Sequence, residues 1–422
     1  MKALGSMDRN ELQQLADELT GRYREIQAKK LNLDMTRGKP SPEQLDLSKG
    51  LLEITDYKAE DGTDCRNYGG LEGLPEARKL FAGLLDAEPG EVIVGGNSSL
   101  NLMHDTIVQA LLRPLPGGSE PWRGAAPIRF LCPSPGYDRH FAICQYLGIE
   151  MVVVGMDDEG PDMDEVERLA GGDPSVKGIW CVPKYSNPTG VTFSAGVVER
   201  LASMHTAAPD FRVFWDNAYA VHHLTGSPDR LPSLLAACQR AGNPDRVFTF
   251  GSTSKITFAG AGVAAMASST ANLNWLKQGM SMQTIGPDKI NQLRHVRFFK
   301  DMDGIAAHMQ KHAALLKPRF YAVEEVLRRE LGDSGAATWT TPRGGYFVSL
   351  DTPDGCASKV VAMAAEAGAK LTAAGATFPG GKDPRDRNIR IAPSLPSVSE
   401  IRQAMELLAI CIRRVAIQKL VD

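Results

Sequence analysis

The sequence is poor in cysteine and lacks the patterns that mark secreted, membrane-spanning or nucleic-acid-binding chains. Its seven cysteines include no Cys-x-x-Cys pair, and an odd number in a chain of this size argues against a disulfide scaffold. No apolar run is long enough to span a bilayer, and residues 1–6 contain no apolar core of signal-peptide length. The formal net charge of −3 lacks the basic excess of nucleic-acid-binding chains. We therefore expect a cytoplasmic protein with no nucleic-acid or membrane partner.

The residues that are present form a regular alternation of strand-like and helix-like segments. Of the 422 residues, 43% are hydrophobic and 23% are charged, and chains of this length usually divide into more than one domain. Apolar runs rich in β-branched residues predict strands, and they are separated mostly by segments with helical spacing. The predicted strands are 92–94, 128–132, 151–154, 178–182, 212–215, 247–250 and 263–267, and the predicted helices include 100–112, 139–147, 163–169 and 195–205.

The two ends of the chain differ from its middle in the pattern of predicted helices and strands. A polar helix is predicted over 11–30, and beyond about residue 290 longer helices (304–331, 359–367 and 399–420) alternate with the strands 345–350 and 388–391. Continuous apolar strands, as in the middle, are typical of a mostly parallel sheet buried by helices on both faces. We predict an α/β fold with a large domain, residues 55–295, and a smaller α+β domain built from residues 1–54 and 296–422.

A serine-rich turn ending in a lysine follows the predicted strand 247–250. In Gly251-Ser252-Thr253-Ser254-Lys255, partial desolvation would lower the lysine pKa and allow an imine with an aldehyde. The alternative is a surface lysine in a loop. Ser252-x-x-Lys255 also matches a β-lactamase motif, but its companion motifs Ser-Asp-Asn and Lys-Thr-Gly are absent. Residues 260–265 match a dinucleotide fingerprint but lead into an apolar run instead of leaving one.

Three further polar motifs stand at ends of predicted strands, where open α/β sheets build ligand sites. Asp216, in Trp215-Asp216-Asn217-Ala218-Tyr219, is either a helix cap or a carboxylate that pairs with a pyridine nitrogen. Asn187, in Ser186-Asn187-Pro188-Thr189-Gly190, is either part of an ordinary turn or a donor to a phenolic oxygen. Ser98 and Ser99, in Gly95-Gly96-Asn97-Ser98-Ser99-Leu100, are either plain helix N-caps or part of a helix start that binds phosphate.

Together, the order and spacing of these motifs resemble the fold-type I pyridoxal-phosphate (PLP) enzymes of the class I/II aminotransferase family, from about Asp34 to the C-terminus. The finer match is to bacterial aspartate aminotransferases related to the catalytic domain of MocR regulators. The resemblance implies the aspartate aminotransferase fold, with a mostly parallel seven-stranded sheet in the large domain. It also implies PLP as cofactor and a homodimer with shared active sites.

The same resemblance implies a role for each matching residue. Lys255 would hold PLP as a Schiff base and move the proton at the substrate carbon. Asp216 would pair with the pyridine nitrogen, and Asn187 and Tyr219 would donate hydrogen bonds to the cofactor O3′. The remaining implied contacts are to the phosphate (Asn97, Ser98, Ser99, Ser252, Ser254, and Tyr68 from the neighbouring subunit), to the cofactor ring (Tyr137) and to the substrate α-carboxylate (Gly38 and Arg390, with Asn187 nearby). A fork-shaped guanidinium suits a carboxylate because it binds both oxygens.

One position departs from the pattern. The family usually has an arginine eight residues after the lysine that pairs with the phosphate, and here that position is Val263. The departure leaves open whether another cation serves the phosphate or whether hydroxyl groups and a helix N-terminus suffice.

The reaction expected from these residues is transfer of an amino group between an amino acid, aspartate or glutamate, and a 2-oxo acid such as 2-oxoglutarate by a ping-pong mechanism. A PLP-dependent β-lyase on the same scaffold is the alternative, since it would use the same lysine with a different pocket. A PLP-binding regulator would need a DNA-binding domain before residue 33, for which we expect no room. The adjacent His222 and His223 have no third ligand at a suitable spacing, so we expect no metal.

Overall fold

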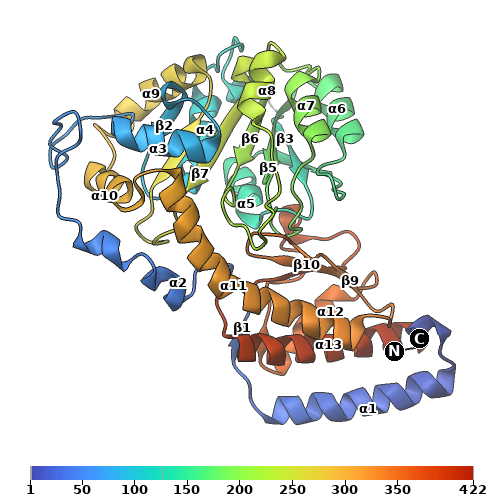
Figure 1. Cartoon of the computed structure of the whole chain (residues 1–422). Coiled ribbons are helices and arrows are strands. Elements are labelled where there is room, and N and C mark those ends of the chain that lie inside the picture. Colours follow the sequence, from blue (N-terminus) through green and yellow to red (C-terminus); the bar gives the residue numbers. More distant parts are fainter. Residues whose placement is uncertain (1, 126, 422) are drawn as a thin grey trace.

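The computed structural model describes residues 2–125 and 127–421, and its largest element is a seven-stranded sheet (Figure 1). The strand order is β2-β8-β7-β6-β5-β3-β4. The strands are β2 (Val92–Val94), β3 (Arg129–Pro133), β4 (Glu150–Val154), β5 (Val176–Cys181), β6 (Arg212–Asp216), β7 (Val247–Ser252) and β8 (Ala264–Ala267). Each of the seven apolar runs predicted as a strand therefore forms one.

The central strands of this sheet are parallel, as their apolar sequences predict. Strands β4, β3, β5, β6 and β7 pair in parallel, whereas β8 runs antiparallel to both β7 and β2. Neighbouring residues of β6 point to opposite faces: Val213 and Trp215 join one hydrophobic cluster, and Phe214 joins another. Burial on both faces explains why the strands read as continuous apolar runs.

Helices cover both faces of the sheet, and most of them begin at a side chain that caps the first turn. Ser98, Asp162, Ser194, Ser233, Ser269 and Asp288 each accept a hydrogen bond from a backbone N–H in the first turn of the helix that follows, which stabilises helix starts. The helices are α3 (Pro75–Leu85), α4 (Ser99–Leu112), α5 (Asp138–Leu147), α6 (Met163–Gly172), α7 (Ala195–Ser203), α8 (Leu234–Arg240), α9 (Thr270–Gln283) and α10 (Lys289–Phe299).

The two chain ends lie together below the sheet in the view of Figure 1. Four long helices dominate this part: α1 (Arg9–Ala28), α11 (Met302–Leu331), α12 (Ala357–Glu366) and α13 (Val398–Val421). They accompany an antiparallel sheet of β9 (Thr338–Trp339), β10 (Val348–Asp351) and β12 (Asn388–Ile391) and a parallel pair, β1 (Leu33–Asp34) with β11 (Ala369–Lys370). The remaining helices are α2 (Pro42–Asp46) and the 3-10 turns Leu4–Ser6, Lys49–Glu53, Pro89–Glu91, Trp122–Ala125, Pro244–Arg246 and Pro379–Gly381.

The predicted strand 345–350 begins later than expected. Gly345 adopts a left-handed conformation with φ of 80° and donates its backbone N–H to the carbonyl of His222, so strand β10 starts only at Val348. The segment before β10 thus turns toward the loop after β6, and this turn brings Tyr346 and Phe347 close to Tyr219.

The hydrophobic clusters separate the two ends of the chain from its middle. One cluster combines Leu4–Met35 with Leu316–Ile417 and includes four residues from 182–224, while the other two lie within residues 59–309. Helix α11 runs from one region into the other (Figure 1). We therefore keep residues 55–295, and residues 1–54 with 296–422, as the proposed large and small domains. Within the described ranges, no helix combines the length and apolar character needed to cross a membrane.

Candidate active site

The four strand-end motifs converge on one cavity of about 150 Å³ at the carboxyl edge of the large sheet. Parallel strands bring their carboxyl ends to the same edge, which is why residues far apart in sequence meet there. The lining includes most of the predicted cofactor-binding residues: Ser98, Ser99, Tyr137, Asn187, Asp216, Tyr219, Ser252, Ser254 and Lys255. Two predicted residues are not among them. Asn97 is exposed beside the cavity, and the Tyr68 side chain is 83% exposed.

Asp216, the last residue of β6, is a buried carboxylate with one oxygen left unpaired. Its Oδ2 lies 3.1 Å from Nε2 of His140, whereas its buried Oδ1 has no hydrogen-bond partner among the described residues. The His140 ring stacks on Trp180, with ring centroids 4.2 Å apart and planes 8° apart. An unpaired buried carboxylate oxygen is costly. A protonated ring nitrogen in the cavity would supply the missing partner, so this site fits a pyridine cofactor.

Lys255 follows β7 in a turn that removes its amine from water. Burial lowers the pKa of Lys255, the carboxylate of Asp216 opposes that shift, and the guanidinium of Arg390 adds to it. The Nζ atom lies 5.0 Å from the centre of the Tyr219 ring, and burial raises the pKa of the Tyr219 hydroxyl well above its usual value. A lowered lysine pKa increases the fraction of neutral amine, which is the form that reacts with an aldehyde.

Hydroxyl groups and a helix N-terminus form the end of the cavity proposed for the phosphate. Ser98 caps α4 by accepting from the backbone N–H of Leu100 at 3.3 Å. Ser252 donates to Ser254 at 3.2 Å, and Ser254 donates to the Asn97 carbonyl at 3.3 Å. Lys255 is the sole cationic side chain among the described residues that line the cavity. Val263 is buried in the core, so its position contributes no cation.

A second cavity of about 480 Å³ adjoins the first and shares Tyr137, Asn187, Tyr219 and Lys255 with it. Its other lining residues are Thr36, Arg37, Gly38, Lys39, Asp138, Arg139, Phe347, Leu371, Thr372, Ala373 and Arg390. Gly38 is required by close packing, because a Cβ atom there would lie 2.3 Å from the Phe347 ring. The predicted cofactor residues and the predicted substrate residues, Gly38 and Arg390, therefore surround connected spaces.

Arg390 lies on β12 with its guanidinium only partly paired. One terminal nitrogen, Nη1, donates to Asp138 at 2.9 Å and to Asn187 at 3.3 Å, and Nη2 donates to Thr372 at 3.4 Å. Its buried Nε has no partner in the described structure, and the guanidinium lies 5.0 Å from the centre of the Phe347 ring. This group is fixed in direction and retains a donor for an anionic ligand.

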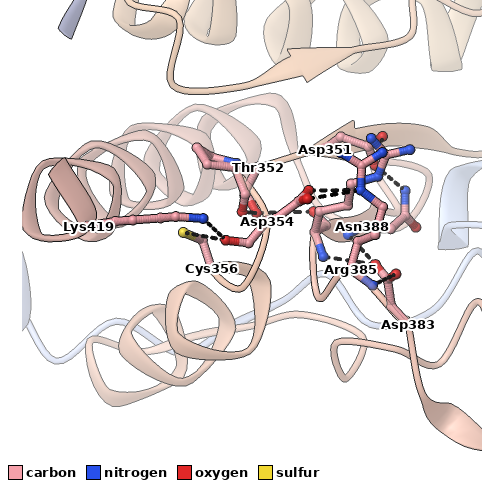
Figure 2. A network of polar contacts seen from close by, with 10 residues as sticks. Asp351, Thr352, Asp354, Cys356, Asp383, Arg385, Asn388 and Lys419 are labelled. Carbon is pink, nitrogen blue, oxygen red and sulfur yellow. Dashed lines mark hydrogen bonds and ion pairs between the residues drawn. The ribbon is translucent and has the colours of Figure 1, made fainter. Parts of the chain in front are cut away.

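A polar network where β10 ends and β12 begins holds the strand that carries Arg390 (Figure 2). The Asp383 carboxylate accepts the backbone N–H groups of Arg385, Arg387 and Asn388 at 2.8–2.9 Å. The Asn388 side chain in turn donates to Ser349 and Asp351 on β10 at 2.9 and 2.8 Å. These bonds fix the β10–β12 register.

The structure adds residues that the sequence analysis did not assign. His140 supports Asp216, and His222, to which the sequence analysis gave no role, lies with Nε2 3.3 Å from the carbonyl of Lys255. Tyr346 donates its hydroxyl to the same carbonyl at 3.3 Å. His140 carried a weak signal as a single histidine within the predicted helix 139–147, but its partner lies 76 residues away.

Comparison with known proteins gives matches over nearly the whole chain. The profile of a family described as aspartate amino-transferase matches residues 7–422. An aspartate aminotransferase of Corynebacterium glutamicum is 47% identical over 399 residues, which cover 94% of this chain and 92% of that protein.

Solved structures agree with this match. A crystal structure of an aspartate transaminase from Corynebacterium glutamicum has a TM-score of 0.97 to this chain at 46% identity, with 99% of both chains covered. An α-aminoadipate aminotransferase from Thermus thermophilus, crystallised with N-(5′-phosphopyridoxyl)-L-leucine, shares the fold with a TM-score of 0.74 at 21% identity, covering 96% of this chain and 98% of that one.

Proposed function

The chain belongs to the aspartate amino-transferase family, and from this premise we propose that it moves the amino group of aspartate or glutamate to a 2-oxo acid such as 2-oxoglutarate by a ping-pong mechanism. The protein is an aminotransferase of the fold-type I PLP class, and its cofactor is pyridoxal 5′-phosphate. Bound PLP accepts the amino group and withdraws electrons from the substrate α-carbon. The observation that carries the dicarboxylate proposal is the cavity next to Lys255, which is lined by four cationic side chains besides that lysine: Arg37, Lys39, Arg139 and Arg390.

We assign the cofactor contacts to this chain's residues as follows. Lys255 would carry the aldehyde carbon, and the unpaired Oδ1 of Asp216 would face the ring nitrogen and keep it protonated. Asn187 and Tyr219 would bind the ring oxygen, and Tyr137 would lie against the ring. Hydroxyl groups at the start of α4 and the end of β7 would hold the phosphate, because a helix N-terminus favours an anion. These residues are Ser98, Ser99, Ser252 and Ser254, with Asn97 beside them.

In the reaction, Lys255 would move a proton at the substrate α-carbon. Its lowered pKa suits an amine that must accept and return a proton near neutral pH. Tyr219, buried beside it, would help to exclude water from the transfer.

Arg390 would bind the α-carboxylate of every substrate. Its Nε has no hydrogen-bond partner among the described residues, and Gly38, against which the Phe347 ring packs directly, lines the same cavity. A second cationic residue must then bind the side-chain carboxylate of the substrate. Arg37 is our candidate, because its side chain lines the same cavity and has no hydrogen bond or ion pair within the described ranges.

We further propose a homodimer in which Tyr68 reaches the partner's phosphate site. Tyr68 and Met282 are each 83% exposed, and Ile285 is 63% exposed. Met282 lies at the end of α9 and Ile285 in the loop that leads to α10, and the start of α10 contacts the Tyr68 loop, because Lys289 donates to the Gly69 carbonyl at 2.6 Å. In Figure 1 the segment between α2 and α3 runs as a long loop outside α10. Exposed apolar side chains on such segments suit a subunit interface. A cytoplasmic location remains a prediction.

A panel of amino donors assayed with 2-oxoglutarate tests the proposed function. Without an acceptor, each subunit should convert one equivalent of aspartate or glutamate to the corresponding 2-oxo acid and then stop, as a ping-pong transfer requires. With L-serine or L-cysteine, which carry a leaving group on the β-carbon, continuous release of ammonia with pyruvate would instead identify a β-lyase. Equal rates with alanine and aspartate would contradict the dicarboxylate proposal but leave aminotransfer intact.

A further inference from the structure

Gln44, in the short helix α2, is a fully buried side chain that makes three hydrogen bonds. Its Oε1 accepts the backbone N–H of Ser41 at 3.1 Å. Its Nε2 lies 3.0 Å from the Tyr346 hydroxyl and 3.0 Å from Nδ1 of His312. An amide nitrogen has two hydrogen atoms to donate and no capacity to accept. Gln44 therefore donates to both partners, and each partner must accept.

The first branch from Gln44 ends at the carbonyl of Lys255. Because the Tyr346 oxygen accepts from Gln44, its own hydrogen is free to point away, and it donates to the Lys255 carbonyl at 3.3 Å. The Tyr346 ring is buried and packs against Tyr219 and His222, with centroids 6.0 and 5.5 Å away. Because the Tyr346 ring is buried, contacts with the protein and not with water determine its position and the direction of its hydroxyl group.

The second branch ends at His308. Accepting at Nδ1 requires His312 to carry its proton on Nε2, and Nε2 of His308 lies 3.1 Å from that nitrogen. Burial lowers the pKa of His312 to about 4, so the ring is neutral at neutral pH.

We propose that Gln44 is a positioning residue for Lys255: by donating to Tyr346 it orients the hydroxyl that binds the carbonyl of Lys255, and its second donated bond, to His312, fixes the amide in that orientation. This inference rests on the proposed role of Lys255. Gln44 belongs to the same N-terminal segment as residues 36–39, which line the substrate cavity. This segment therefore also supports the turn that carries Lys255. With the donors removed, the Tyr346 hydroxyl can rotate and His312 can change tautomer, and the lysine amine loses its fixed direction.

Substitutions of Gln44 can separate the effect of its donated hydrogen bonds from the effect of its side-chain shape. Gln44→Met keeps the length of the side chain but donates nothing, and Gln44→Glu keeps the Ser41 contact with at most one donor. We expect kcat for L-aspartate with 2-oxoglutarate to fall about tenfold in Gln44→Met, the order of one or two lost hydrogen bonds, and less in Gln44→Glu. KM should stay within about twofold, because Gln44 does not line the substrate cavity. Capture of PLP by the apoenzyme, followed by its absorbance, should slow as well.

Two further variants complete the design. Tyr346→Phe removes a single hydroxyl and should lower kcat by part of the same factor, and adding it to Gln44→Met should cost little more, since both act through one bond to Lys255. Gln292→Met is the matched control: Gln292 is also buried, and it accepts from the Leu74 backbone N–H at 2.8 Å and bonds none of the described residues of this network. It should lower the melting temperature and leave kcat unchanged.

The outcomes distinguish this inference from the proposal beneath it. A wild-type kcat in Gln44→Met, or an equal loss of kcat in Gln292→Met, would overturn the positioning role while borohydride labelling still placed the cofactor on Lys255. Labelling of another lysine would instead overturn the proposed site. If Gln44→Met does not fold, Tyr346→Phe decides the matter: an unchanged kcat and an unchanged rate of PLP capture in that variant would contradict the inference.

Discussion

A half-paired carboxylate is the most informative single residue of this site. Asp216 uses one oxygen for His140, and the other lies at a cavity with no hydrogen-bond partner among the residues that the structure describes. Such a group is tolerated only where a ligand completes it or where function requires it. We therefore expect its charge to matter far more to the reaction than to the fold.

Asp216→Asn tests this expectation. The variant should still bind PLP but lose about two to three orders of magnitude in kcat/KM, because a neutral amide no longer keeps the ring nitrogen protonated and the ring withdraws electrons less well. Steady-state kinetics together with the absorbance of bound PLP measure both effects. His140→Phe, which keeps a ring beside Trp180, should lose less. Near-normal turnover of Asp216→Asn would remove Asp216 from the mechanism.

Arg390 should act on all substrates alike. Removing a buried guanidinium that binds the α-carboxylate should cost about 2–5 kcal/mol of transition-state binding, because the ligand charge is left unpaired. Arg390→Ala should thus lower kcat/KM by a similar factor for every amino acid tested. Arg390→Lys should recover only part, since an ammonium cannot reproduce the fork. If Arg390→Ala lost activity toward acidic donors alone, Arg390 would be the side-chain reader instead.

At the scale of elements, the precision of Arg390 depends on how strand β12 is held. The loop before β12 is closed by one carboxylate, Asp383, which accepts three backbone N–H groups, and Asn388 ties the strand to β10 (Figure 2). The arginine is thus placed by a network that does not touch the cavity.

Asp383→Ala should loosen this strand. We expect the free energy of unfolding to fall by about 1–2 kcal/mol, as for a lost capping carboxylate, and KM for the amino acid to rise because Arg390 is less well fixed. Urea unfolding and steady-state kinetics measure the two effects. Asp354→Ala serves as control and should change neither, because the Asp354 carboxylate belongs to the same network but, within the described part of the chain, bonds only the exposed Arg385. An unchanged KM in Asp383→Ala would show that β12 is positioned by its sheet contacts alone.

The elements of the large sheet could be predicted from the sequence because burial on both faces leaves a plain signature. Runs such as Val92–Val94 and Val247–Ser252 are apolar and bounded by turns, and Ser98 and Ser194 mark helix starts. The chemistry of the site could be predicted for the same reason: Asp216 ends a strand that is itself recognisable, and parallel strands meet at one edge.

Other features could not be predicted, because they depend on contacts between distant parts of the chain. The apolar sequence of β8 does not indicate that this strand is antiparallel to its neighbours. Strands β1, β9 and β11 are two residues long, which is too short for a periodic pattern. The bond between Gln44 and His312 spans 268 residues. Local sequence cannot indicate whether such a histidine packs, binds a ligand or orients a neighbour.

For the whole molecule, the exposed Tyr68 leads to the prediction of a dimer. Sedimentation should give twice the chain mass, and Tyr68→Ala should weaken PLP binding without altering assembly, because the partner's phosphate contact is lost. Met282→Asp should instead shift the protein toward monomer, since a charge placed in an apolar interface is unfavourable. A fully active monomer of the unaltered chain would rule out the shared site.

The central claim, that the chain is a PLP aminotransferase built around Lys255, is tested most directly by reducing the PLP-bound protein with borohydride and mapping the label. Reduction fixes the cofactor to the amine that carries it, and peptide mass spectrometry then identifies the residue. We predict that the pyridoxyl label lies on Lys255 alone and is absent from Lys255→Ala treated in the same way. A stoichiometric label on any other lysine, such as Lys39 in the adjoining cavity, would contradict this assignment.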